Sequence, residues 1–103
     1  MQNNGAIDEL ESAWDAFSAP LRTRGGFHHA AFQQLCDALR ACEAEWSSDA
    51  TVPKRLASTL VDMAPAIEAC SHLYSGEEAE AIRHAADTAA DLVRACVQVE
   101  WEV

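Results

Sequence analysis

Apolar residues along the chain recur at alternating steps of three and four, the spacing that places side chains on one face of an α-helix. Four segments show this pattern, and turn-forming residues separate them. The apolar seams consist, in chain order, of Ile7, Leu10, Trp14, Phe17 and Leu21; Phe32, Leu35, Leu39, Cys42 and Trp46; Leu56, Leu60, Met63, Ile67, Cys70 and Tyr74; and Ile82, Ala85, Ala89, Leu92, Cys96 and Val99. The pattern predicts four amphipathic helices.

Capping and helix-breaking residues predict the ends of the first two helices. Asn3 or Asn4 supplies a cap before the first seam, and Pro20 with Gly25 and Gly26 is expected to end that helix. The second helix is expected to span about Phe27–Trp46, because the polar residues 47–49 then interrupt the pattern.

The third and fourth helices carry further local signals. Thr51 is a suitable cap for the third helix, with Pro53 tolerated in its first turn. Pro65 falls inside the same seam, where its missing N–H predicts a kink or a division into two shorter helices. Ser75 followed three residues later by Glu78 predicts a capping box at the start of the fourth helix.

Short connections between consecutive helices favour antiparallel neighbours. We therefore expect an all-α fold, an up-and-down antiparallel four-helix bundle that forms one domain over residues 1–103. In such a bundle the first and last helices are neighbours. The chain contains 21 alanines, so each helix contact buries little area, and a homodimer is a plausible way to bury more.

The formal net charge of −10 is unevenly distributed along the chain. Residues 1–20 carry four acids and no base, and residues 76–103 carry seven acids and two bases. Residues 21–55 are almost neutral, with five bases and four acids. This balance disfavours direct binding to nucleic acid or to an anionic membrane, and it favours attraction to basic surfaces.

The acids of the first and last segments fall on helical stripes. Those predicted to bind a partner, together with one histidine, are Asp8, Glu11, Asp15, Glu77, Glu80, His84, Asp87 and Asp91. If the terminal helices are neighbours, the two stripes merge into one acidic face. That face would dock a basic protein, and in the extreme case would imitate nucleic-acid phosphates. The alternative is an ordinary solvated surface.

Candidate metal ligands are few. Glu80, His84 and Asp87 have a helical spacing that would present three ligands on one face, but that face is predicted to point outward. Cys70 and His72 are expected at the same end of the bundle as the two histidines of residues 28–29, which leaves a mixed Cys/His zinc site open. We nevertheless predict no metal and no cofactor.

The cysteines lack the short C-x-x-C spacing of redox and zinc motifs. They are therefore expected to be buried, reduced thiols, as in a cytoplasmic protein. Cys42 and Cys96 are expected at the same end of the bundle. The N-terminal residues contain neither a basic region nor an apolar run, so we expect no signal peptide. No stretch approaches the roughly 18 apolar residues of a membrane span.

One arrangement suggests catalysis. Arg22 and Arg24 precede His28 and His29 by four to seven residues, and this pairing resembles the Arg–His motif of HEPN-type helical ribonucleases. The resemblance implies a cation at the scissile phosphate and a histidine base near the 2′-hydroxyl. Here the motif follows the first helix, whereas that family carries it beside the final helix.

The last seven residues, 97–103, alternate strictly between apolar and polar side chains, which is typical of a strand. Either the fourth helix continues through them, or they pair with another chain by strand addition.

Together these features predict a cytoplasmic, non-enzymatic protein that binds a basic protein partner. The class is that of a small acidic inhibitor or adaptor, such as an immunity protein, an antitoxin or a phage inhibitor. The alternatives are the HEPN-like ribonuclease and a structural dimer subunit without catalysis.

Overall fold

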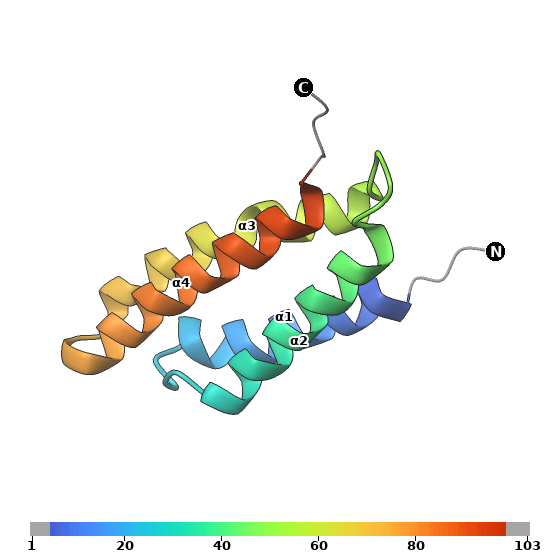
Figure 1. The fold of residues 1–103 in the computed structure, drawn as a ribbon. Helices are drawn as coiled ribbons and strands as arrows, with labels where there is room; N and C mark the ends of the chain where they lie inside the picture. The colour runs from blue at the N-terminus through green and yellow to red at the C-terminus, as the bar shows by residue number, and fades with distance from the viewer. Residues whose placement is uncertain (1–4, 99–103) are drawn as a thin grey trace, which may run out of the picture.

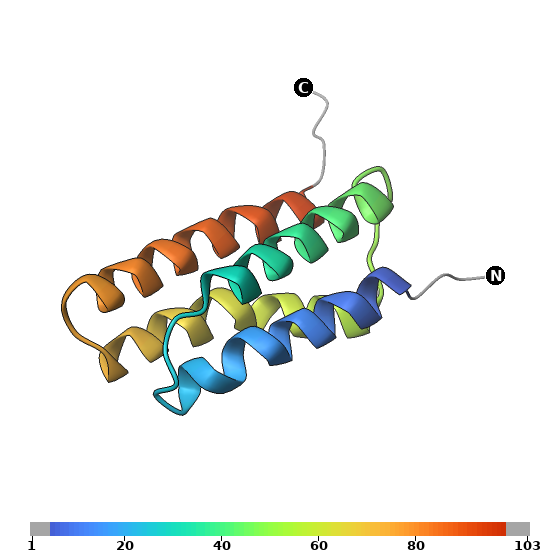
Figure 2. The same ribbon diagram turned by 90° about the horizontal axis from the view of Figure 1, so that it is seen from below.

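The computed structural model describes residues 5–98 of the chain as four α-helices (Figure 1). They are α1 (Gly5–Arg22), α2 (His29–Trp46), α3 (Lys54–Cys70) and α4 (Gly76–Val97), and a short 3₁₀ helix, η1 (Ser71–Leu73), follows α3. Successive helices run in opposite directions (Figures 1 and 2). The chain therefore forms an all-α four-helix bundle, as the sequence predicts.

The expected contact between the first and last helices is wrong. α1 packs against α2 and α3, and α4 also packs against α2 and α3, so α1 and α4 occupy diagonal corners (Figures 1 and 2). The connection at residues 47–53 crosses the end of the bundle to reach α3. Seven extended residues reach about 23 Å. The diagonal between helices about 10 Å apart is only about 14 Å. The connection is therefore long enough to place α3 at the corner diagonal to α2, and not at the corner beside it.

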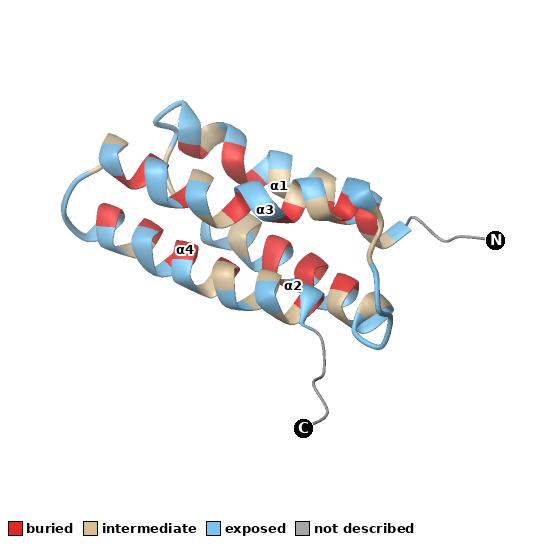
Figure 3. Ribbon diagram, turned by 90° about the horizontal axis from the view of Figure 1, so that it is seen from above, coloured by how far each residue is buried: buried red, intermediate tan, exposed pale blue. Residues whose placement is uncertain are grey.

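Within the described residues, which exclude Val99, the four predicted seams line the interior of the bundle (Figure 3). The largest fully buried side chains are Phe17, Ile7, Leu10, Leu21, Leu35, Leu39, Leu56, Leu60, Met63, Ile67, Ile82 and Cys42. Trp14, Phe32 and Trp46 are partly buried and pack against this core. These buried residues form one core cluster to which all four helices contribute.

Two prolines lie inside helices and do not divide them. α1 continues past Pro20 to Arg22, so it ends between the proline and the two glycines that were together expected to end it. The Pro20 carbonyl accepts the N–H of Gly25 at 2.6 Å, which closes the turn after the helix. α3 is one helix through Pro65, so the expected division in two does not occur. Pro65 and Val61 are both exposed, which leaves the unpaired Val61 carbonyl open to water.

The expected cap of α3 is wrong, and that of α4 lies at the expected residue but does not form a capping box. Pro53, with φ −59° and ψ 143°, occupies the N-cap position of α3 in place of Thr51. Ser75 is the N-cap residue of α4, but its side chain makes no capping hydrogen bond. Glu78 does not reach back to complete a capping box, because its carboxylate bonds elsewhere. Asn3 and Asn4, the caps expected for α1, lie outside the described residues.

The C-terminal end of α4 partly tests the two alternatives for residues 97–103, a continued helix and a strand that pairs with another chain. Val97 is the last helical residue, and Gln98 has an extended backbone with φ −67° and ψ 131°. The fourth helix therefore does not continue through Gln98, and residues 99–103, on which the alternative of strand addition depends, lie outside the described part. Between residues 5 and 98 no segment is a strand, and no helix is both long and apolar enough to cross a membrane.

Candidate functional site

The predicted row on α4 is exposed along its whole length, at Glu77, Glu80, His84, Asp87 and Asp91. Arg83 pairs with Glu80 at 3.2 Å, and Arg94 pairs with Asp91 at 3.1 Å, each across one helical turn. Both pairs are exposed, so each contributes little to stability. Within residues 5–98, the other two carboxylates of the row form no ion pair. The row, hereafter the α4 acidic row, keeps a negative charge.

The acids of α1 are arranged differently, because α3 supplies a cation to them. The Arg55 side chain donates from Nη2 to Asp8 Oδ1 at 2.6 Å and to Glu11 Oε1 at 2.6 Å, and from Nε to Glu11 Oε2 at 2.8 Å. The hydrogen bond from Arg55 lowers the pKa of Glu11, and the two carboxylates raise the pKa of Arg55. Asp8 and Glu11 therefore join α1 to α3.

The structure does not bring the two predicted stripes together. Asp8, Glu11 and Asp15 lie on α1, diagonally opposite the α4 acidic row. Asp15 is exposed and forms no ion pair with any residue in the described part of the chain. The single acidic face expected from the sequence is thus replaced by two separate acidic surfaces, each with a net excess of two carboxylates over its paired arginines.

The loop between α1 and α2 is held from the opposite hairpin. The Tyr74 hydroxyl accepts a hydrogen bond from the Gly26 N–H at 3.1 Å and donates one to the Leu21 carbonyl at 2.9 Å. Glu78 Oε2 accepts the N–H of Phe27 at 3.1 Å. Gly26 has φ +107°, a conformation that side-chain-bearing residues rarely adopt. The sequence placed Tyr74 on the core seam and gave no signal of this polar role.

The arginines and histidines of the ribonuclease-like motif do not bond to one another. Arg22 donates to Ser18 Oγ at 3.3 Å, while His28 Nε2 lies 3.2 Å from the Gly25 carbonyl oxygen. His29 packs against the Phe27 ring, with the two ring centroids 4.7 Å apart. Arg24 is in the left-handed region, with φ 62°. Arg22, His28 and His29 thus each contact a residue nearby in the sequence, and all four motif residues are exposed at one end of the bundle.

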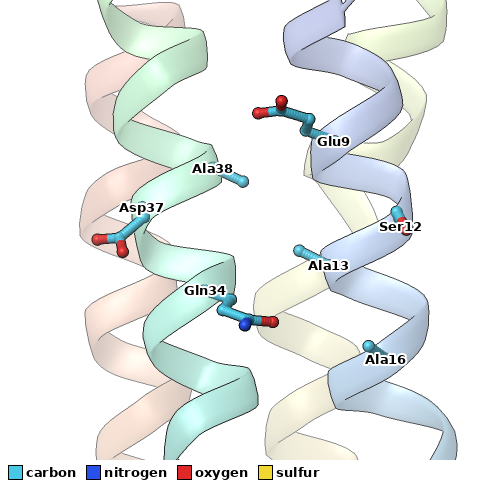
Figure 4. A pocket seen from close by; sticks show the side chains of 7 residues that line it. All are labelled: Glu9, Ser12, Ala13, Ala16, Gln34, Asp37 and Ala38. Atoms are coloured by element: carbon cyan, nitrogen blue, oxygen red, sulfur yellow. The ribbon is translucent and has the colours of Figure 1, made fainter.

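The larger hollows on the surface were not predicted from the sequence. The first, of about 370 Å³, lies between α1 and α2, and its lining residues are Glu9, Ser12, Ala13, Ala16, Gln34, Asp37 and Ala38 (Figure 4). Glu9 and Gln34 reach into the space between the helices, whereas Asp37 points away from α1 (Figure 4). The alanines leave this space because a methyl group cannot fill the gap between two helices.

The second hollow, of about 360 Å³, lies where α2 and α4 begin, and we call it the α2–α4 hollow. Its lining residues are Phe27, His29, Glu77, Glu78 and Ala81. Glu77 therefore belongs both to this hollow and to the α4 acidic row. Of these five residues, only Glu77 was predicted to bind a partner. The others were missed because α4 lies beside α2 only as a result of the diagonal connection between α2 and α3, which the local sequence pattern does not indicate.

All four cysteines are free, buried thiols. Burial raises the pKa of Cys42 to about 11 and that of Cys96 to about 12, and Cys42 itself contributes to the shift of Cys96. The expected proximity of these two thiols is confirmed. Cys96 Sγ lies 3.4 Å from the Leu39 carbonyl oxygen, and Cys42 Sγ lies 3.6 Å from the Ala6 carbonyl oxygen. Such thiols are poor nucleophiles and poor metal ligands.

Within the described residues, no group of three histidine, cysteine, aspartate or glutamate side chains is arranged to hold a metal ion. Comparisons with protein-family models, curated proteins and solved structures found no match for the chain.

Proposed function

We propose that this chain is a cytoplasmic, non-catalytic binding protein whose α4 acidic row docks a basic protein partner. It would act as an inhibitor or adaptor, in the manner of an immunity protein, an antitoxin or a phage inhibitor. The observation that carries the proposal is the exposed, net negative row from Glu77 to Asp91 on one helix.

Electrostatics supports a basic partner. The chain carries a net charge of −10, which attracts basic surfaces over a screening distance of about 8 Å at physiological salt. The ion pairs that Glu80 and Asp91 make with their own arginines are exposed and weak. A partner's lysines or arginines can replace them at little cost, so all four carboxylates of the row are available for docking.

The charge density of the row favours a basic protein surface over strict imitation of nucleic acid. Glu77 and Asp91 are 14 residues apart, which corresponds to about 21 Å along the helix axis. Four carboxylates over this length give one charge per about 5 Å, whereas duplex DNA carries one per about 1.7 Å. A partner that recognises the full phosphate density of a duplex would therefore find an incomplete match here.

The state of the cysteines supports two parts of this proposal, the cytoplasmic location and the absence of catalysis by a thiol. Four free cysteines are typical of a reducing compartment. Their burial and raised pKa values make them unsuitable as nucleophiles. They pack as small apolar side chains in the core.

Two triple variants with the same change in charge test the proposal. One replaces three acids of the row, Glu80→Lys, Asp87→Lys and Asp91→Lys. The control replaces three exposed acids on α1 and α3, Asp15→Lys, Asp62→Lys and Glu68→Lys. Both can be used as bait in quantitative affinity capture from native cells, beside the wild type.

We expect a basic protein to be retained by the wild type and by the control variant, and to be lost with the α4 variant. Circular dichroism should confirm that both variants are folded. Equal capture of that protein by the α4 variant would refute the role of the row. Capture of no partner by the wild type would refute the proposed function itself.

A further inference from the structure

The α2–α4 hollow is lined by two kinds of side chain, aromatic and acidic. The aromatic residues are Phe27, from the loop before α2, and His29, the first residue of α2, and the carboxylates are those of Glu77 and Glu78 in the first turn of α4. At about 360 Å³ it lies at the small end of the range of ligand pockets, about 300–1,000 Å³. We infer that this hollow binds an arginine side chain of the basic partner, an inference that rests on the proposed function.

The aromatic wall is fixed before any ligand arrives. The Phe27 ring packs against Phe17 with centroids 5.7 Å apart and an interplanar angle of 87°, and it also contacts Phe32 at 5.7 Å. Its backbone N–H is held by Glu78, and the preceding N–H of Gly26 is held by Tyr74. A wall anchored in the core and at the backbone loses little conformational entropy on binding.

The sign of the local charge selects a cation. The two helix N-termini beside the hollow are each equivalent to about half a positive charge. Neither is neutralised by a cap, because the N-cap residues His28 and Ser75 make no side-chain capping bond. Glu77 and Glu78 together carry two full negative charges, which exceed this positive contribution. The hollow therefore favours a cation and disfavours an anion such as phosphate.

The geometry of the groups favours guanidinium over ammonium. An arginine side chain can stack its planar face on an aromatic ring while its edge donates paired hydrogen bonds to a carboxylate, and lysine cannot do both. Glu78 uses only Oε2 for the Phe27 N–H, and Glu77 makes no ion pair with any residue from 5 to 98. Both therefore have oxygens left to accept from a guanidinium group.

The position of the hollow is consistent with a partner that lies along α4. Glu77 stands at the N-terminal end of the α4 acidic row, and the rest of the row continues for about 21 Å along the same helix. An arginine near one end of the partner's basic surface would enter the hollow while neighbouring lysines or arginines pair with the row. The hollow would supply a defined anchor, and the row would supply attraction.

Titration of the intact protein, labelled with ¹⁵N and followed by NMR, tests this inference. The probes are Nα-acetyl-arginine methylamide, the matching lysine compound, and the uncharged norleucine compound as a control. Saturable shifts are expected at the amides of Phe27, His29, Glu77 and Ala81 with the arginine probe. Weaker shifts are expected with lysine, and none with norleucine.

Matched variants localise the binding. Glu77→Gln removes one charge from the hollow and should weaken arginine binding about threefold to fivefold, as expected for one partly exposed charged contact. Phe27→Leu keeps an apolar side chain in the core and should weaken binding by removing the ring. Asp62→Asn removes an exposed charge from α3, outside both the hollow and the α4 acidic row, and should leave binding of the free arginine probe unchanged.

Shifts that spread along α4 without saturating, or equal binding by Glu77→Gln and the wild type, would overturn the inference. If Phe27→Leu fails to fold, the result with Glu77→Gln still decides whether the hollow binds the arginine probe. Failure of the arginine probe while affinity capture still depends on the row would refute the hollow alone. Saturable arginine binding without any captured partner would refute the proposed function and leave the hollow as an arginine site.

Discussion

The carboxylate of Glu78 accepts a hydrogen bond from the backbone N–H of Phe27, with 3.1 Å between the nitrogen and Oε2. The two residues are 51 positions apart, and the bond joins the first turn of α4 to the loop that precedes α2. A residue that the sequence assigns to a local cap thus serves a long-range contact. This contact orders one wall of the α2–α4 hollow.

Replacing Glu78→Ala should release the loop at Phe27. The lost hydrogen bond is exposed, so the free energy of unfolding should fall by only about 0.5–1.5 kcal/mol. Hydrogen exchange at the Phe27 amide should accelerate more than exchange in the core of α2. Glu78→Gln retains an acceptor oxygen and serves as the control, with exchange close to that of the wild type. Unchanged exchange at Phe27 in the alanine variant would show that the bond does not order the loop.

Replacing Tyr74→Phe removes one hydroxyl and two hydrogen bonds. The Gly26 N–H and the Leu21 carbonyl both lose their partner in a partly buried place, while the ring stays in the core. We expect urea denaturation to show a loss of about 1–3 kcal/mol. A variant as stable as the wild type would mean that solvent replaces the hydroxyl at both positions.

The ion pair between Arg55 and Glu11 should make stability depend on pH. Hydrogen bonding to Arg55 lowers the pKa of Glu11 in the folded protein. A lowered folded-state pKa adds stability above the pKa of the unfolded chain, about 4.3 for glutamate, and this contribution disappears as the pH falls through the folded-state value. Arg55→Gln should therefore be less stable than the wild type at neutral pH.

The two proteins should become equally stable as the pH is lowered, which chemical denaturation at a series of pH values would show. Added salt should also reduce the difference, because the groups are partly exposed. A difference that is independent of both pH and salt would assign the effect of Arg55 to packing of its aliphatic stem.

The buried thiols should be unreactive in the folded protein. Cys42, with a pKa of about 11, has roughly a hundredfold less thiolate at pH 8 than an ordinary cysteine, and Cys96 has less still. Alkylation by iodoacetamide, followed by mass spectrometry, should be slow until denaturant is added. Rapid native labelling of either residue would contradict their placement in the core.

The same raised pKa values predict a loss of stability in alkaline solution. Unfolded thiols ionise above about pH 8.5, whereas the folded thiols stay protonated until the pH approaches 11 to 12. The contribution is present in full below the unfolded pKa and is lost as the pH rises toward the folded value. The double variant Cys42→Ala and Cys96→Ala, although less stable overall, should lose less stability between pH 8.5 and 11 than the wild type does.

The fold was largely predictable because its signals are local. Spacings such as Leu35, Leu39 and Cys42 require only one helix, and all three side chains are buried as expected. The relation between α1 and α4 was not predictable in this way. That relation depends on the corner of the bundle at which α3 begins. The connection at residues 47–53 is long enough to reach either the corner beside α2 or the corner diagonal to it.

The candidate site was predictable only in part, for the same reason. The exposure of Glu80 and Asp87 follows from the period of α4 alone. The pairing of Glu11 with Arg55 and of Glu78 with Phe27 joins residues 44 and 51 positions apart, and no local pattern signals either contact. The sequence pattern therefore did not indicate that Arg55 pairs with two of the α1 carboxylates, or that aromatic residues lie beside Glu77.

The most direct test of the account is the association rate with the purified partner, measured across a range of salt concentrations for the two triple charge-reversal variants. We predict that reversal of Glu80, Asp87 and Asp91 slows association about tenfold or more at low salt and flattens its salt dependence. The control reversal on α1 and α3, with the same net charge, should be affected much less. Equal slowing by both variants would show that overall charge, and not the α4 acidic row, governs docking.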